Sequence, residues 1–234
     1  MIADKMLPSV YVIIPAFNES LSIGKVINDI PKDLVTEIVV VNNGSTDNTE
    51  NIAKNHGATI LTENRKGYGY SCLKGMDYLS SKAKSNDIIV FLDGDYSDFP
   101  KEISLVINPI IHTSYQMVIG SRVLGERQSG SLLPQQIAGN WLATKLIKLF
   151  FNAEFSDLGP FRAISWNALK EINMQDKTFG WTVEMQIKAA KNKLKFTEVP
   201  VSYRKRIGKS KVSGTIKGTF MAGYKILFTI FKYI

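Results

Sequence analysis

The sequence predicts an α/β fold in which a mostly parallel β-sheet is flanked by helices. Runs of aliphatic and β-branched residues, typical of strands, alternate with segments of helical periodicity. The runs at residues 10–14, 37–41 and 88–92 are almost entirely apolar, as expected of parallel strands that are buried on both faces. Ligands bind such sheets outside the carboxyl ends of the strands, so the residues after each run are the first candidates for a site.

In the first half of the chain, each expected strand is followed by an expected helix. Pro15 breaks the first run, and the helical pattern after it ends at Pro31. The second run leads through residues 42–47, rich in helix-capping side chains, into a short helix. A third strand is expected at residues 59–62, and a glycine-punctuated loop then leads into a helix that ends near Ala83.

The second half is less regular and mixes short strands with longer helices. We expect strands at residues 117–120, within 157–164 and at 196–203, helices at residues 134–151 and 182–191, and a basic loop at residues 204–211.

The last segment, residues 216–234, is mostly apolar but carries three lysines. At helical spacing Lys217, Lys225 and Lys232 share one arc, and aromatic and aliphatic residues lie opposite. A membrane-spanning helix tolerates three lysines poorly, so no transmembrane span is predicted. Two alternatives remain: a helix that lies in a membrane interface, or an amphipathic helix packed on the domain.

The composition limits which partners and which kinds of metal site the chain can have. The 234 residues carry a net charge of +8, which favours polyanionic partners such as phosphorylated substrates, anionic lipid surfaces or nucleic acid. Positive charge is concentrated from Lys188 onward, where Glu198 is the sole acidic residue. One cysteine excludes a disulfide framework, and two histidines disfavour a histidine-based metal site. Residues 1–8 show no signal-peptide pattern, so we expect a cytoplasmic protein.

Two carboxylates follow the buried run at residues 88–92. Asp93 and Asp95 are separated by Gly94, which allows the backbone to bend so that both side chains reach one point. Like charges at short range repel unless a cation lies between them, and a hard divalent ion with oxygen ligands fits this pair. The alternative is an ordinary acidic turn that closes a strand.

Other strand ends carry residues suited to a nucleotide. Phe17 can cover a base, and the Asn43 amide matches the adjacent N–H and C=O groups of uracil or guanine. Lys66 and Gly67 can hold ribose or phosphate. Arg122 and the basic loop can neutralise phosphates. Each of these features alone also fits a turn, a loop or a solvated surface, whereas their order along the chain is specific. No basic motif interleaved with aromatic residues supports nucleic-acid binding.

Five motifs in this order resemble those of family-two glycosyltransferases of the GT-A fold. They are Val-Ile-Ile-Pro-Ala-Phe-Asn-Glu (12–19), Val-Val-Val-Asn-Asn-Gly-Ser-Thr-Asp (39–47), Gly-Tyr-Gly-Tyr-Ser-Cys-Leu-Lys-Gly-Met (67–76), Phe-Leu-Asp-Gly-Asp (91–95) and Gly-Ser-Arg (120–122). The fourth of these contains the Asp-x-Asp pair. The segment at 67–76 and the later Arg206-x-Gly-x-Ser-Lys211 resemble the dolichyl-phosphate mannose synthase-like branch. The resemblance covers residues 10 to about 212.

The resemblance implies a nucleotide-sugar donor, inverting transfer, and Mg²⁺ or Mn²⁺ at the Asp-x-Asp pair. Asp95 would be the main metal ligand, with Asp93 near ribose and metal. Some members carry a glutamine ligand where Ser97 stands here, which leaves the third ligand open. The remaining implied positions are the nucleoside pocket (Pro15, Phe17 and Glu19), the base-facing Asn43 in place of the family's aspartate, the phosphate-gripping Arg122, Arg206 and Lys211, and the acceptor-facing Glu184.

The resemblance also implies an organisation and an activity. Residues 1–212 would form the GT-A domain, with a nucleotide-sugar-binding half at about 8–122 and an acceptor half at 123–212, before the amphipathic helix of residues 213–234. We expect a hexose to move from a UDP-glucose or GDP-mannose type donor to a polyprenyl phosphate at the inner face of the membrane. The alternatives are transfer to a saccharide hydroxyl, with Glu184 as general base, and a non-catalytic nucleotide-sugar-binding protein.

Overall fold

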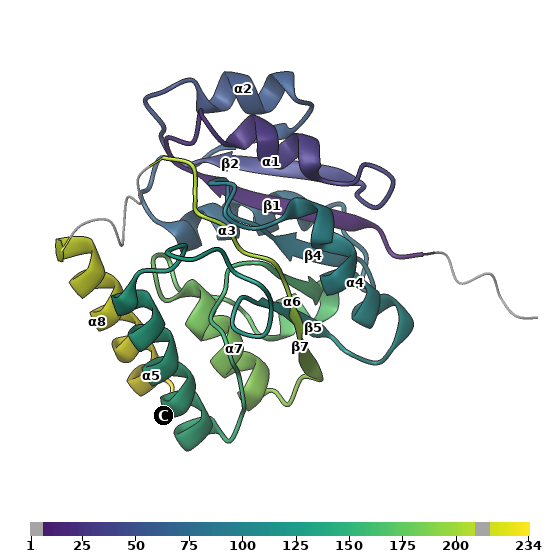
Figure 1. Cartoon of the computed structure of the whole chain (residues 1–234). Coiled ribbons are helices and arrows are strands. Elements are labelled where there is room, and N and C mark those ends of the chain that lie inside the picture. The colour runs from purple at the N-terminus through teal and green to yellow at the C-terminus, as the bar shows by residue number, and fades with distance from the viewer. Residues whose placement is uncertain (1–6, 209–215) are drawn as a thin grey trace, which may run out of the picture.

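The computed structural model describes residues 7–208 and 216–234, and its centre is a seven-stranded sheet (Figure 1). The strand order is β3-β2-β1-β4-β6-β5-β7. The strands are β1 (Val10–Ala16), β2 (Glu37–Asn42), β3 (Thr59–Thr62), β4 (Ile88–Phe91), β5 (Met117–Ser121), β6 (Arg162–Ser165) and β7 (Phe196–Pro200).

All neighbouring strands run parallel except at β6, which is antiparallel to both β4 and β5. The predicted mostly parallel sheet is therefore confirmed. β1 continues through Pro15, where we expected a break. Its pairing with β4 stops at Ile13, so the N–H that proline lacks is not needed on that side.

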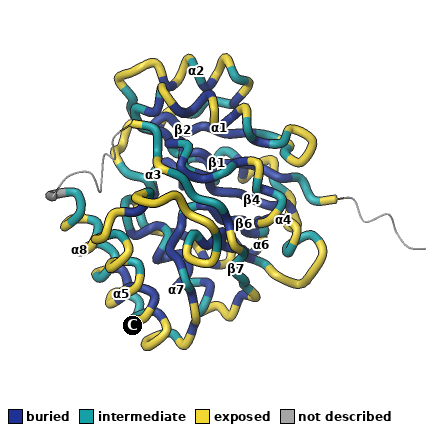
Figure 2. Tube along the Cα trace, in the orientation of Figure 1, coloured by how far each residue is buried: buried dark blue, intermediate teal, exposed yellow. Residues whose placement is uncertain are grey.

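Helices cover both faces of the sheet, and the sheet is the most buried layer of the molecule (Figure 2). On one face lie α1 (Ile23–Asp29), α2 (Thr49–Asn55) and α4 (Ile103–His112), preceded by a 3₁₀ turn (Pro100–Glu102). On the other lie α3 (Tyr68–Leu79), α6 (Trp166–Glu171) and α7 (Trp181–Lys191), with α5 (Pro134–Phe151) and α8 (Ile216–Lys232) outside them.

The side chains of β1 show why its sequence is apolar throughout. Tyr11 and Ile13 enter one hydrophobic core, and Val12 and Ile14 enter the other. A strand with both faces buried needs no polar alternation. The structure adds two helices that we did not predict, α4 and α6. The first contains Pro109, which reads as a helix breaker, and the second follows β6 directly.

The last helix, α8, packs against α5 and α7. Within residues 7–208 and 216–234, no helix is both long and apolar enough to cross a membrane. The expected domain boundary after residue 212 lies outside the described residues, so it stays a prediction.

Candidate active site

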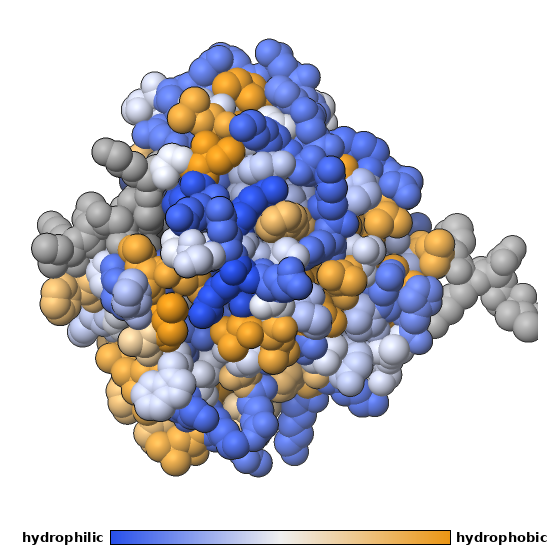
Figure 3. All heavy atoms as spheres, viewed as in Figure 1, coloured by the Kyte–Doolittle hydropathy of each residue, from blue (hydrophilic) through white to orange (hydrophobic). Residues whose placement is uncertain are grey.

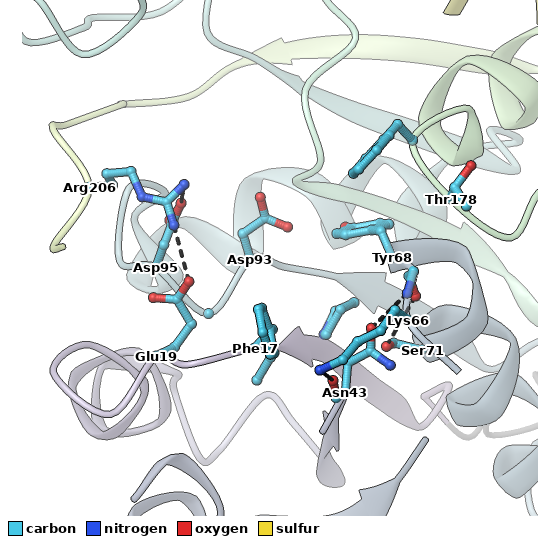
Figure 4. Close-up of a pocket in the computed structure, with 15 residues that line it drawn as sticks. Phe17, Glu19, Asn43, Lys66, Tyr68, Ser71, Asp93, Asp95, Thr178 and Arg206 are labelled. Carbon is cyan, nitrogen blue, oxygen red and sulfur yellow. Dashed lines mark hydrogen bonds and ion pairs between the residues drawn. The ribbon is translucent and has the colours of Figure 1, made fainter. Parts of the chain in front are cut away.

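A cavity of about 450 Å³ lies at the carboxyl ends of β1, β2 and β4 (Figure 4). It is lined by ten of the residues singled out in the sequence: Pro15, Phe17, Glu19, Asn43, Lys66, Gly67, Asp93, Gly94, Asp95 and Arg206. Glu19, Asp95 and Arg206 gather at one end, and Asn43 and Lys66 at the other, with Phe17 between them. Segments distant in sequence thus meet in one pocket because their strands are neighbours in the sheet.

Asp95 is held firmly at its end of the pocket. Its Oδ1 accepts hydrogen bonds from the backbone N–H of Ser97 (2.9 Å) and from the Ser97 hydroxyl (2.5 Å). A Cβ on Gly94 would lie 3.5 Å from Ile14 and Ile23, an ordinary contact distance. The bend that brings the two aspartates together is therefore not one that only glycine allows.

Arg206 bridges two carboxylates across the mouth of the pocket. One guanidinium nitrogen lies 3.2 Å from Oδ2 of Asp95, and the other lies 3.0 Å from Oε1 of Glu19. Two backbone hydrogen bonds, from Ile207 N–H to Asp95 O (3.0 Å) and from Arg204 N–H to Ser97 O (2.9 Å), hold the basic segment beside the acidic turn. A cation thus already compensates the charge of Asp95.

Asp93 has a different environment from Asp95. Its Oδ1 is buried and has no hydrogen-bond partner among the described residues. Burial, and then the negative charge of Asp95, raise the pKa of Asp93 to about 7. Asp98 is also buried, and both of its carboxylate oxygens lack hydrogen-bond partners in the same part of the chain. Asp93 and Asp98 thus carry three buried carboxylate oxygens that no described hydrogen bond stabilises.

These residues fit a divalent cation that shares its ligands with a phosphorylated substrate. Within the described ranges no three Asp, Glu, His or Cys residues form a metal-binding group. Mg²⁺, however, is commonly held by one or two carboxylates together with substrate phosphates and water. The unpartnered Oδ1 of Asp93 would be one ligand atom, and Oδ2 of Asp95 would be a second if Arg206 gave up its ion pair to the metal.

At the opposite end, Asn43 shapes a loop. Its amide nitrogen donates to the backbone oxygens of Glu63 and Arg65, both at 2.8 Å, and its Oδ1 accepts from the N–H of Gly67 at 2.8 Å. Both donor hydrogens are used, so the expected pairing of this amide with a base through donor and acceptor together is not supported. One lone pair on Oδ1 remains for a base N–H.

Lys66 is also held by this loop. Its Nζ donates to the backbone oxygens of Asn43 (3.1 Å) and Gly44 (2.9 Å), and it lies 4.0 Å from the centre of the Phe17 ring. The lysine thus covers an aromatic face at the pocket wall.

Other pocket residues escaped the sequence analysis. Tyr68 and Ser71 come from the first turn of α3, and Thr178 and Phe179 come from the loop before α7. The first two belong to the motif at residues 67–76, which gave a signal for the segment but not for these side chains. Thr178 and Phe179 lie in a loop with no recognisable pattern, so only the fold reveals them.

Two predicted site residues, Arg122 and Glu184, are described by the structure but do not line the pocket. Arg122 donates to both carboxylate oxygens of buried Asp157 at 2.7 Å, so its charge is already paired. Glu184 is fully buried and accepts hydrogen bonds from backbone N–H groups of the loop before α7, which does not support a role as general base. Lys211 lies outside the described residues.

The family model described as Glycosyl transferase family 2 matches residues 11–172, which include the strands and turns that build most of the pocket. The chain belongs to glycosyl transferase family 2. The predicted family is therefore confirmed, and so is the predicted GT-A fold.

Individual relatives of this family 2 chain agree with the assignment. A UDP-N-acetylglucosamine–dolichyl-phosphate N-acetylglucosaminyltransferase from Methanococcus voltae is 30% identical, with 85% of this chain and 86% of the relative covered. A dolichyl-phosphate hexose transferase from Haloferax volcanii is 28% identical, with 86% and 85% covered. Glucosyl-3-phosphoglycerate synthase from Mycobacterium tuberculosis, solved with Mn²⁺, UDP-glucose and phosphoglyceric acid, has a TM-score of 0.76 at 20% identity. The alignment covers 97% of this chain and 79% of the synthase, and the likeness is one of fold.

Proposed function

We propose that this family 2 glycosyltransferase is an inverting, metal-dependent enzyme that moves a hexose from a nucleotide-diphosphate sugar to a polyprenyl phosphate. The observation that carries the proposal is the arrangement of the pocket. A polar loop with Asn43 and Lys66 lies at one end, Glu19 and Asp95 with Arg206 lie at the other, and the ring of Phe17 lies between them. This is the order of chemistry along a sugar nucleotide, from base to diphosphate.

The acidic end suits the diphosphate only if positive charge accompanies it. Asp93 and Asp95 would hold a Mg²⁺ or Mn²⁺ ion, which when bound supplies charge neutralisation for the departing nucleoside diphosphate. Arg206 contributes a second positive charge at the same end. Its two present partners, Glu19 and Asp95, keep the guanidinium at the mouth of the pocket, where phosphate oxygens compete for it.

The carboxylates that line this pocket favour a phosphate acceptor over a sugar hydroxyl. A phosphate oxygen is already anionic, so it can attack the anomeric carbon without a general base, whereas a sugar hydroxyl must lose a proton. Glu184 is buried away from the pocket lining, and the lining carboxylates are Glu19, Asp93 and Asp95, of which the first and last pair with Arg206. The two relatives named for dolichyl-phosphate acceptors also favour this acceptor class.

The outer helices support an acceptor that resides in a membrane. α5 and α8 lie side by side and expose large apolar side chains on the side of the molecule where Figure 3 shows hydrophobic residues gathered. We call these residues the α5–α8 face: Ile137, Trp141, Leu142, Leu149, Phe150, Phe220, Met221, Tyr224, Phe228 and Phe231. Neither helix contains an acidic residue, and both contain lysines. An anionic bilayer satisfies both features at once.

The donor and the metal can be tested together by thermal unfolding. Sugar nucleotides are added with Mn²⁺ to the wild type and to Asp95→Ala. A ligand at one hundred times its Kd stabilises the folded state by about 2.7 kcal/mol, so the true donor should raise the Tm of the wild type by several degrees and leave the variant unchanged. A panel in which no sugar nucleotide stabilises the wild type would contradict the proposal. With the donor identified, transfer to a polyprenyl phosphate, compared with a saccharide acceptor, tests the acceptor class.

A further inference from the structure

One wall of the pocket is formed by residues 173–180, which we call the wall loop. It contributes Thr178 and Phe179 to the lining. The loop also packs tightly against the start of α3, where the backbone oxygen of Lys177 accepts from the N–H of Tyr70 at 3.1 Å. A Cβ on Gly69 would lie only 2.1 Å from the backbone oxygen of Asp176. The position of the wall loop therefore sets the shape of the pocket at α3.

Glu184 holds the wall loop from behind. Its carboxylate accepts hydrogen bonds from the N–H groups of Gln175 (3.0 Å to each oxygen) and Asp176 (2.6 Å). The side chain is fully buried, so these charge-assisted bonds are shielded from water.

Asp176 is the second anchor of the same loop. Its Oδ1 accepts from the N–H groups of Thr178 (2.7 Å) and Gly180 (3.1 Å). Two short-range bonds thus hold the segment that carries Thr178 and Phe179 in its bend.

Both anchors are contacted from the end of the described chain. The hydroxyl of Tyr233, just beyond α8, donates to Oε1 of Glu184 at 2.5 Å, and Lys225 of α8 lies 2.9 Å from Oδ2 of Asp176. Lys188 of α7 completes the charge balance at 3.0 Å from Glu184. Each acidic anchor of the pocket wall therefore has a partner on α8 or directly after it.

We propose that α8 positions the wall of the active-site pocket, with Glu184 and Asp176 as the positioning residues that transmit its placement. Glu184 acts on the substrate site through the backbone of the wall loop and not by proton transfer. Because α8 also forms half of the α5–α8 face, contact of that face with a bilayer bears directly on the pocket. This proposal rests on the proposed function only in its second test, where a sugar nucleotide is the ligand whose binding is measured.

The test removes a single hydroxyl. Tyr233→Phe deletes the bond to Glu184 and keeps the ring, and Tyr224→Phe, on an exposed part of α8, is the matched control. Hydrogen–deuterium exchange is followed at Gln175 and Asp176 and over residues 66–70. We expect faster exchange at these amides in Tyr233→Phe, unchanged exchange in the core strand β1, and no change at either place in the control. Unchanged exchange in Tyr233→Phe would overturn the proposal.

A second measurement uses ligand binding. The donor identified in the thermal panel should bind about three- to tenfold more weakly to Tyr233→Phe and to Lys225→Met than to Tyr224→Phe, because only part of the free energy of the lost contact is transmitted to the donor site. Wild-type affinity in both variants would overturn the coupling. If the wild type binds no sugar nucleotide, only the proposed function is contradicted, because the exchange experiment tests the role of α8 without a ligand.

Discussion

At the scale of single residues, the two aspartates of the acidic turn are unequal. Asp95 accepts two hydrogen bonds from Ser97 and pairs with Arg206, whereas Asp93 keeps a buried oxygen without a partner among the described residues. The raised pKa of Asp93, about 7, follows from burial and from the charge of Asp95. Ionising Asp93 therefore costs free energy that Arg206 does not fully offset, and a bound divalent cation would lower this cost.

Asp93→Asn should stabilise the metal-free protein at high pH. Between the ordinary pKa of 3.8 and the folded value of about 7, the folded state binds more protons than the unfolded state, so the stability contribution of Asp93 is lost as pH rises through this window. We expect Asp93→Asn to gain about 1–3 kcal/mol at pH 8 and little near pH 4. Thermal unfolding with a chelator present measures this difference.

The exposed Asp77 of α3 provides the matched control for this prediction. Because this side chain is exposed, Asp77→Asn should change stability at pH 8 by less than about 0.5 kcal/mol. A loss of stability in Asp93→Asn at pH 8 would show that the ionised carboxylate is already compensated without metal. The same variant should lose Mn²⁺-dependent stabilisation by the donor.

Residue-level prediction worked best where a side chain directly follows a strand. The strand order places Phe17, Asn43, Asp93 and Asp95 at one edge of the sheet whatever the details of the loops. For Glu184, the sequence position shows that it lies in the first turn of a helix but not that its carboxylate bonds to a neighbouring loop. Hydrogen bonds to a backbone distant in sequence leave no periodic signal.

At the scale of elements, the packing of α3 on the wall loop depends on the absence of a side chain at Gly69. Gly69→Ala would place Cβ 2.1 Å from Asp176 O, and backbone atoms cannot yield as a flexible side chain can. We expect a loss of about 1–3 kcal/mol in stability, as for other overpacked sites, together with loss of donor binding. Chemical denaturation and the thermal panel measure the two effects.

Gly139 of α5 is the matched glycine for that experiment. It is exposed, and a Cβ there would meet nothing within 4 Å. Gly139→Ala should therefore stabilise the protein by about 0.5–1 kcal/mol, since alanine favours the helix. Equal effects of the two substitutions would contradict the close packing of α3 against the wall loop.

The elements also show what hydrophobic pattern can and cannot predict. The apolar runs located β1, β2, β4 and β5, because burial on both faces leaves a continuous apolar stretch in the sequence. The reversed direction of β6, inserted between β4 and β5, leaves no mark in the sequence, since burial is the same for either direction. The helix α4 was missed because Pro109 lies inside it.

At the scale of the whole molecule, the pocket and the α5–α8 face are joined through α8. Its buried side carries Thr229 and Ile230, and its outer side exposes Phe220 and Tyr224 at 75% and 66%. The sequence analysis left open whether this helix packs on the domain or faces a membrane. The structure shows that α8 packs on the domain, and its exposed outer side also allows contact with a membrane.

The α5–α8 face should bind anionic vesicles. Trp141 is 61% exposed, whereas Trp166 and Trp181 are buried, so a blue shift of tryptophan emission on adding phosphatidylglycerol vesicles would report insertion of this face. Lys145→Glu/Lys148→Glu should weaken binding about 10- to 100-fold, since each lysine near an anionic surface contributes about 1 kcal/mol. The control Lys54→Glu/Lys170→Glu makes the same change of charge on exposed residues of α2 and α6. Equal weakening by the two double substitutions would show that vesicle binding depends only on net charge. A concentration-dependent dimer that buries Trp141 would show that the α5–α8 face binds a second copy of the chain. Binding that depends on the α5 lysines and falls with salt would instead identify this side of the molecule as the one that meets the membrane.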